Sequence, residues 1–142
     1  MQNIKNQKGF TLIELLVVVV IIGVLSAWAI YALSNARVKS RDAKRVADMR
    51  QLVSALDLYY NDSGIYPTSV NPGNSLTYGS TTYLAVVPSN PTPNNDGNCP
   101  ANTNYSYSSG DNTSYTISYC LGASIGDLSA GAHHATPNGL NN

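Results

Sequence analysis

Few side chains in this chain of 142 residues have the chemistry of an enzyme active site. Glu14 is the only glutamate, and there are two cysteines, Cys99 and Cys120. The two histidines, His133 and His134, are adjacent, so in a regular element they cannot share one face around a metal ion. We find no nucleophile with a base, no phosphate-binding loop and no paired catalytic carboxylates. The sequence therefore predicts a protein that is not an enzyme.

The two cysteines predict a disulfide. Twenty residues lie between Cys99 and Cys120, a spacing that fits neither a four-ligand metal site nor a C-x-x-C redox motif. A disulfide that closes such a loop contributes about 3 kcal/mol in the chain-entropy model. It persists only outside the reducing cytosol, so the segment that carries it is expected to be extracytoplasmic.

Glu14 lies inside an apolar segment that is long enough to cross a membrane. It is the only residue with a side chain charged at neutral pH among the 24 residues from Phe10 to Leu33. As a helix they would extend roughly 36 Å, and the hydrocarbon core of a bilayer is about 30 Å thick. A chain of this size could not surround a helix that is apolar on all faces, so a soluble core helix is not expected.

A conventional secretory signal is the main alternative for this segment. Lys5 and Lys8 would form its basic region, and Ala27-Trp28-Ala29 fits a cleavage site. However, the apolar run is longer than that of an ordinary signal, and a disposable signal has no use for Glu14. This alternative describes a secreted binding domain cut after Ala29. A third alternative is an uncleaved, membrane-anchored binding domain.

The stretch from Gly9 to Leu25, GFTLIELLVVVVIIGVL, resembles the amino-terminal signature of type IV pilins and type II secretion pseudopilins. In that family a prepilin peptidase removes a short basic leader that ends in glycine. The new terminal residue is then N-methylated, and the apolar helix remains as anchor and assembly core. The resemblance implies a leader at residues 1–9, cleavage between Gly9 and Phe10, and methylation of Phe10.

The resemblance also implies a role for Glu14 in assembly. In the family this carboxylate is thought to pair with the terminal amine of a neighbouring subunit, here that of Phe10. A low dielectric strengthens such a pair and penalises either charge left alone, so the pair favours one axial stagger between helices. The alternative is a tolerated glutamate at the membrane interface. The residues implied for assembly are Phe10, Leu12, Glu14, Leu15, Leu16, Val19 and Ile22.

The helical pattern continues beyond the apolar segment. Apolar residues recur at spacings of three and four up to Tyr60, and no proline occurs before Pro67. We expect one helix, with a transmembrane part at 10–33 and an amphipathic part at 34–60. Two helices hinged at Ser34-Asn35 are the alternative, because Asn is unfavourable inside helices. The apolar stripe consists of Val46, Met49, Leu52, Val53, Leu56, Tyr59 and Tyr60. The charged residues expected on other faces are Arg41, Lys44, Arg45, Asp48 and Arg50.

Residues 61–142 are expected to form a small β-rich head. The segment from Gly64 to Pro67 resembles the Gly-x-Tyr-Pro segment that follows the long helix in major pseudopilins. Alternating tyrosines at 105–108 and 115–121 predict a hairpin with one aromatic face against the helix, and Cys120 on the other face. A further strand is expected near 78–87, and a loose tail around His133 and His134. The fold class is α+β and pilin-like, with a long amino-terminal helix packed on a small antiparallel sheet.

No cofactor is expected, with calcium as the one candidate metal. Asp96 with its neighbouring asparagines, or Asp111 with Asn112, could supply oxygen ligands. Major pseudopilins bind calcium in a carboxy-terminal loop, but their Asp-Pro-Trp-Gly type segment is missing here. The nearest remnant is Ser89 to Thr92. The sequence therefore offers Asp96 and Asp111 only as weak calcium candidates.

Charge is distributed unevenly, although the chain carries eight basic and eight acidic side chains. Every basic residue lies at or before Arg50. Charged residues are only 11% of the chain, against roughly 25% in soluble proteins. Because the head has no basic residue after Arg50, it is not expected to bind nucleic acid.

Two observations on membrane orientation disagree. Five basic residues between positions 37 and 45 follow the apolar segment, whereas Lys5, Lys8 and the initial amine precede it. The positive-inside rule alone would place the head in the cytoplasm. The cysteines favour an external head, and pilin-like proteins commonly carry basic residues on that side. We expect a single-pass protein of the inner or cytoplasmic membrane with a cytoplasmic amino terminus.

The resemblance finally implies a set of partners. They are identical or related pilin subunits, the prepilin peptidase, membrane lipid before assembly, and an inner-membrane assembly platform driven by a separate ATPase. The filament could be a surface pilus, a secretion pseudopilus or a DNA-uptake fibre.

Overall fold

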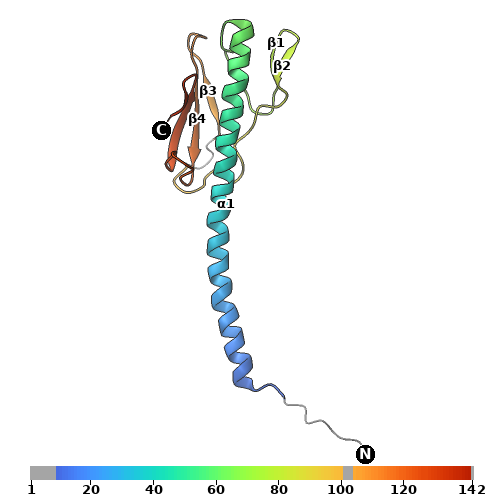
Figure 1. The fold of residues 1–142 in the computed structure, drawn as a ribbon, viewed down its shortest axis with the longest axis vertical. Coiled ribbons are helices and arrows are strands. Elements are labelled where there is room, and N and C mark those ends of the chain that lie inside the picture. Colours follow the sequence, from blue (N-terminus) through green and yellow to red (C-terminus); the bar gives the residue numbers. More distant parts are fainter. Residues whose placement is uncertain (1–8, 101–103, 142) are drawn as a thin grey trace, which may run out of the picture. The chain divides into compact units, whose positions relative to one another are not determined.

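The structure is a computed structural model that describes residues 9–100 and 104–141. The expected leader lies outside this range except for Gly9, and so do Lys5 and Lys8. The chain divides into two units, Met1–Ala36 and Arg37–Asn142. Among the described residues, all of the β structure lies in the second unit (Figure 1).

One helix, α1, runs from Leu12 to Ser63. It is helical throughout, so the expected single helix is confirmed and a break at Ser34-Asn35 is wrong. The run of Leu, Val, Ile and Ala carries no proline, which explains why the helix persists. It ends where Gly64 takes a positive φ of 75° and donates its N–H to the carbonyl of Tyr60 at 2.8 Å. A glycine in this conformation is a common helix stop.

The main sheet has four antiparallel strands in the order β3-β4-β5-β6. These are β3 (Ser106–Ser108), β4 (Thr116–Leu121), β5 (Gly131–Thr136) and β6 (Gly139–Asn141). The predicted hairpin is confirmed, because Tyr107 of β3 pairs with Ile117 of β4. The expected loose tail is wrong, since residues 131–141 form β5 and β6. In β5, His133 and Ala135 are buried while His134 between them is exposed, an alternation that the glycines and Pro137 obscured.

A separate two-stranded sheet consists of β1 (Leu76–Tyr78) and β2 (Thr81–Leu84). A strand was expected near this position, but it does not extend the main sheet. The two strands are joined by a tight turn in which Gly79 has a φ of 58°, so they pair with each other. Leu76 and Leu84 are buried and belong to the same hydrophobic core as α1.

The core of the second unit lies between α1 and one face of β4. Met49 and Leu56 of α1 and Leu121 of β4 are fully buried. The predicted apolar stripe is thereby confirmed, although Tyr60 at its end is 39% exposed and stacks on Tyr66. The predicted aromatic face of the hairpin is also confirmed. Its buried members are Tyr105, Tyr115 and Tyr119, with Ile117 among them.

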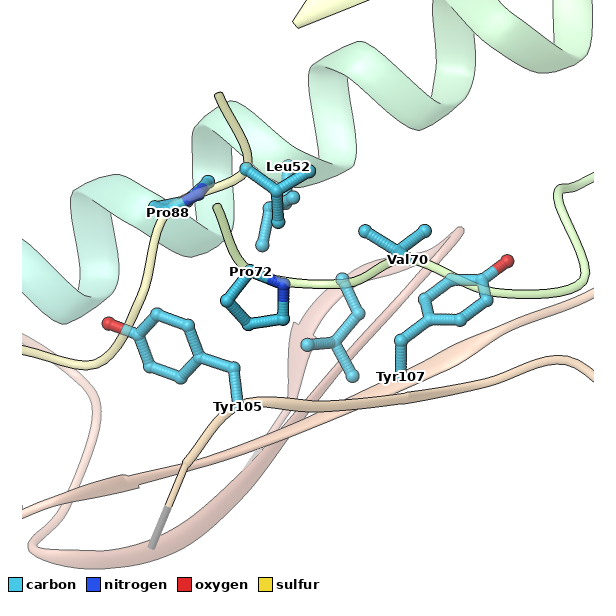
Figure 2. Close-up of a pocket in the computed structure, with 8 residues that line it drawn as sticks. Leu52, Val70, Pro72, Pro88, Tyr105 and Tyr107 are labelled. Carbon is cyan, nitrogen blue, oxygen red and sulfur yellow. The ribbon is translucent and has the colours of Figure 1, made fainter. Parts of the chain in front are cut away.

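Figure 2 shows side chains that line a small gap in this core. Leu52 of α1 faces Val70 and Pro72, and Tyr105 and Tyr107 lie on the opposite side of the gap. The gap has a volume of only about 10 Å³, which is at the lower limit for one water molecule. This part of the core has no room for a small-molecule ligand.

The charged residues of α1 differ from the sequence expectation. Arg45 is completely buried and Asp48 is 7% exposed, although both were expected on outer faces. Asp42 is also completely buried. Lys44 and Arg50 are exposed as expected, and Arg41 is partly buried. Arg45 contacts a loop that contains Asn90 and Asp96, whose position the sequence pattern did not reveal.

Candidate functional site

The start of α1 brings together the residues that the sequence singled out for processing. Gly9 and Phe10 are exposed, and Phe10 is 88% exposed. Thr11 donates both its backbone N–H and its hydroxyl to Glu14 Oε2, at 2.9 and 2.7 Å. In return the N–H of Glu14 donates to Thr11 Oγ1 at 3.3 Å. This is a capping box, so Glu14 also stabilises the first helical turn.

The apolar residues of the first unit have no cover within the described residues. The apolar residues implied for assembly are each at least 56% exposed, and Trp28 is 83% exposed. The described part of the chain contains one helix, α1, that is long and apolar enough to cross a membrane. Contiguous exposed apolar surface of this extent marks contact with lipid or with other protein. The implied residues are Leu12, Leu15, Leu16, Val19 and Ile22.

The second unit contains a buried group of charged and polar side chains that we call the ionic cluster: Arg41, Asp42, Arg45, Asn90 and Asp96. Arg45 lies at its centre. Its guanidinium donates to Asp42 Oδ1 at 2.5 Å, to Asn90 Oδ1 at 2.7 Å and to Asp96 Oδ2 at 3.0 Å. It also donates to the carbonyl of Pro93 at 3.1 Å. Each of its three nitrogens therefore has an acceptor, as a fully buried guanidinium requires.

Arg41 adds a second guanidinium to the cluster. It binds Asp96 through both carboxylate oxygens, at 2.7 and 2.5 Å. This hydrogen bonding holds the pKa of Asp96 below its ordinary value against the opposing effect of burial. The same bond raises the pKa of Arg41. With two arginines and two aspartates the cluster is neutral, which makes its burial tolerable.

Asp42 connects the cluster to the end of β4. Its carboxylate accepts the backbone N–H of Gly122 at 3.0 Å and that of Ala123 at 2.8 Å. Cys120, just before them, is joined by a disulfide to Cys99, so the predicted pairing is present. The cluster and the disulfide therefore fasten the same loop, residues 90–99, to both α1 and β4.

Two glycines permit this close approach. A Cβ atom at Gly122 would lie 2.5 Å from the Cβ of Asp96, a distance that real side chains do not reach. A Cβ at Gly97 would collide with the Gly122 carbonyl, and Gly97 has a φ of 55°. Only glycine fits at both positions without displacing the loop.

Asp48 forms a second buried polar contact outside the cluster. Its Oδ2 accepts the hydroxyl of Tyr105 at 2.9 Å. Burial raises the pKa of Asp48, and the bond from Tyr105 opposes this effect only in part. Burial, with the nearby Asp48 charge, also raises the pKa of the Tyr105 hydroxyl. Asp48 therefore carries a cost when ionised that the neutral ionic cluster avoids.

The calcium candidates are both engaged by other groups. Both oxygens of Asp96 accept hydrogen bonds from arginines, so a cation would have to displace two guanidinium groups. Asp111 accepts the N–H groups of Thr113 and Ser114 and organises its own turn. Within residues 9–100 and 104–141 no three His, Cys, Asp or Glu residues are grouped as metal ligands. Of the two adjacent histidines, His133 is buried, and its Nε2 atom lies 2.7 Å from the carbonyl oxygen of Ser129.

The sequence contained a signal for the ionic cluster. Asp42 and Arg45 extend the spacing of the apolar stripe toward the amino terminus, in the series 42, 45, 49, 52 and 56. A pair of opposite charges at core positions indicates buried pairing. The partners Asn90 and Asp96 carried no such signal, because they lie in an irregular loop about 50 positions away.

Comparisons with known proteins find matches that include the exposed amino-terminal segment described above. A family model described as the prokaryotic N-terminal methylation motif matches residues 4–30. The type II secretion system core protein G of Vibrio cholerae is 37% identical over 95 residues, which are 67% of this chain and 60% of that protein. By this motif and this relative, the chain is similar to type II secretion pseudopilins.

Two further relatives have the same name. The core protein G of Escherichia coli is 42% identical over 69 residues, 49% of this chain and 48% of that protein. The Pseudomonas aeruginosa protein is 35% identical over 65 residues, 46% of each chain. The match thus spans 60% or less of the length of these three relatives. No solved structure matches the chain.

Proposed function

We propose that this protein is a structural subunit of a type II secretion-like filament, that is, a pseudopilin. The observation that carries the proposal is the exposed apolar helix that follows the Gly9-Phe10 motif. A helix of this kind in a small protein needs lipid or identical neighbours around it. The subunit acts by packing, without catalytic chemistry of its own.

Processing would convert the chain to its assembling form. A prepilin peptidase would cut between Gly9 and Phe10, and Phe10 would be N-methylated. The exposure of both residues at the start of α1 supports access to the bond. Removal of residues 1–9 takes away Lys5 and Lys8, so the mature chain has two more acidic than basic side chains.

Before assembly the subunit would be held in the inner or cytoplasmic membrane by residues 10–33. The head would lie outside the cytoplasm, which the Cys99–Cys120 disulfide supports because it would not persist in a reducing compartment. The helices would then pack together in a filament with the heads outward. Related subunits and an assembly platform driven by a separate ATPase would be its partners.

Glu14 has two candidate roles that a pair of variants separates. In the capping box it stabilises the first turn, and in a filament it would neutralise the amine of Phe10 of a neighbouring copy. Thr11→Ala removes one side of the capping box and leaves the carboxylate. Glu14→Ala removes both functions.

The experiment compares these variants in a strain that assembles filaments. We expect both variants to be processed, Thr11→Ala to assemble and Glu14→Ala to give few or no filaments in electron micrographs. Normal filaments from Glu14→Ala would remove the assembly role of this residue. If Thr11→Ala were as defective as Glu14→Ala, helix capping would explain the loss instead.

The type of filament is tested by deletion of the gene. The shared name of the relatives supports a secretion filament over a surface pilus or a DNA-uptake fibre. We expect deletion to abolish export of secreted proteins and to leave surface motility and DNA uptake unchanged. Loss of motility or DNA uptake with normal secretion would assign the subunit to a different filament.

A further inference from the structure

The exposed side of α1 in the second unit carries two opposite charges, Arg50 and Asp57. Within the second unit, one side of the helix is buried against the sheet, through residues such as Met49 and Leu56. Arg50 and Asp57 lie on the exposed side. They are seven residues apart, close to two full turns, so they point in nearly the same direction about 10 Å apart along the helix axis.

Neither side chain has an ion-pair partner in the described part of its own chain. The salt bridges there involve only Arg41, Asp42, Arg45 and Asp96. Arg50 lines a groove of about 470 Å³ together with Val53 and Leu140, and Asp127 lies on an adjoining groove that Arg50 also lines. No salt bridge joins Arg50 to Asp127. Its guanidinium is therefore available to a carboxylate from another molecule.

Small residues on the same side of α1 would let another helix approach closely. Ala43, Ala47 and Ser54 lie on the same exposed side and have short side chains. If the heads of the filament face outward, as the proposed function requires, this side of α1 faces the filament axis. The same faces of neighbouring copies then converge there.

We propose that Arg50 of one copy forms an ion pair with Asp57 of a neighbouring copy displaced by about 10 Å along the axis. The inference rests on the proposed function, because it requires parallel copies with the heads outside. With no displacement, Arg50 would oppose Arg50 and Asp57 would oppose Asp57. A displacement of seven residues removes both repulsions and leaves one attraction, between Arg50 of one copy and Asp57 of the other, so the pair acts as a register for the head part of the helix.

Such a pair would contribute to register more than to affinity. A single exposed ion pair adds little to the strength of one contact. Complementary charges nevertheless disfavour wrong alignments, and a filament repeats the same contact at every subunit. Reversal of one charge should therefore be damaging, because it makes the preferred stagger repulsive along the whole filament.

Charge-reversal variants of the full chain test this pair in a strain that assembles filaments. We expect Arg50→Glu and Asp57→Arg each to reduce the yield of sheared filaments about tenfold. The double variant restores the pair with the charges exchanged and should return the yield to nearly that of the unaltered chain. Lys39→Glu is the matched control, since it makes the same charge change on the same helix side. The residue seven positions after Lys39 is the uncharged Val46, so this control should assemble normally.

A cysteine experiment gives a second measurement that does not depend on filament yield. Copies with Arg50→Cys, mixed with copies carrying Asp57→Cys, should give mixed disulfide dimers in assembled filaments. Copies with Lys39→Cys mixed with the same Asp57→Cys partner should give none. Near-ultraviolet circular dichroism and the processed amino terminus verify that each variant folds and matures.

Either of two results would overturn the ion pair. Single reversals that assemble like the unaltered chain would do so, and so would a folded double variant as defective as the single ones. These results leave the proposed function intact, because the unaltered chain still forms filaments. If the unaltered chain formed no filament at all, the proposed function and the ion pair would both be wrong.

Discussion

Asp42 is a single side chain that joins two distant parts of the head. Its carboxylate binds the guanidinium of Arg45 and the N–H groups of Gly122 and Ala123, so it serves helix and sheet together. Arg45 is fully buried, and it would keep its charge without this partner if Asp42 were truncated. An uncompensated buried charge is among the most destabilising changes in a protein interior.

We expect Asp42→Ala to lower the free energy of unfolding by about 3–5 kcal/mol. The measurement is thermal or denaturant unfolding of the full chain in detergent, followed by near-ultraviolet circular dichroism. Asp127→Ala is the control, because Asp127 is exposed, and it should change stability by no more than about 0.5 kcal/mol. Equal stability of the two variants would show that the ionic cluster does not hold the head together.

The contribution of Asp48 to folding stability should change with pH in the opposite sense from that of a salt-bridged aspartate. Burial raises its pKa in the folded state, so the folded chain binds this proton more tightly than the unfolded chain. Its contribution to stability therefore falls as the pH rises from the unfolded pKa through the folded one. At neutral pH the buried ionised carboxylate is a cost.

We expect Asp48→Asn to raise the melting temperature at pH 7, because the amide oxygen can still accept the Tyr105 hydroxyl and no charge is buried. The gain should shrink as the pH is lowered toward the ordinary pKa of aspartate, about 4, because the raised pKa of Asp48 makes the folded chain bind this proton before the unfolded chain does. Melting curves of both chains between these pH values test this. A loss of stability at pH 7 would mean that the charge of Asp48 is favourable in the folded state.

Among the elements, the loop at residues 90–99 depends on its fit against the end of β4. The Cβ that alanine would add at Gly122 would lie 2.5 Å from the Asp96 Cβ and 2.8 Å from the Asp96 carbonyl carbon. The backbone cannot easily retreat, since the Cys99–Cys120 disulfide and the Asp42 hydrogen bonds hold both sides.

We expect Gly122→Ala to cost about 1–3 kcal/mol of unfolding free energy, as overpacking typically does. Gly110→Ala is the matched control, because nothing lies within 4 Å of its Cβ position and its φ is not positive. Chemical denaturation of the two variants gives the comparison. If Gly122→Ala were as stable as the control, the contact between the loop and β4 would be looser than described.

The regular elements were predictable from local patterns, and the loop contacts were not. The spacing from Val46 to Leu56 identified the buried side of α1, and tyrosine alternation identified the β3-β4 hairpin. Arg45 was expected on an outer face because charged residues are usually exposed. Its partners Asn90 and Asp96 come from an irregular loop distant in sequence, so the sequence pattern did not indicate its burial. The β5 and β6 strands were missed because glycines and Pro137 interrupt a short apolar pattern.

Across the whole molecule, charge and apolar surface follow the division into two units. The first unit exposes apolar side chains, with Glu14 as its one acidic residue among residues 9–36. The second unit buries a neutral ionic cluster and keeps Arg50 and Asp57 on its surface. This arrangement suits a subunit that passes from lipid into a filament, where the first unit is covered by neighbours and the head stays hydrated.

Mass spectrometry of the amino terminus of the mature chain tests the central claim most directly. The chain should be purified from membranes of its own bacterium and digested, so that the terminal peptide can be sequenced. We predict a terminal peptide that begins at N-methylated Phe10. A chain that begins at Ile30, after a cut behind Ala29, or one that retains residues 1–9 would contradict the account.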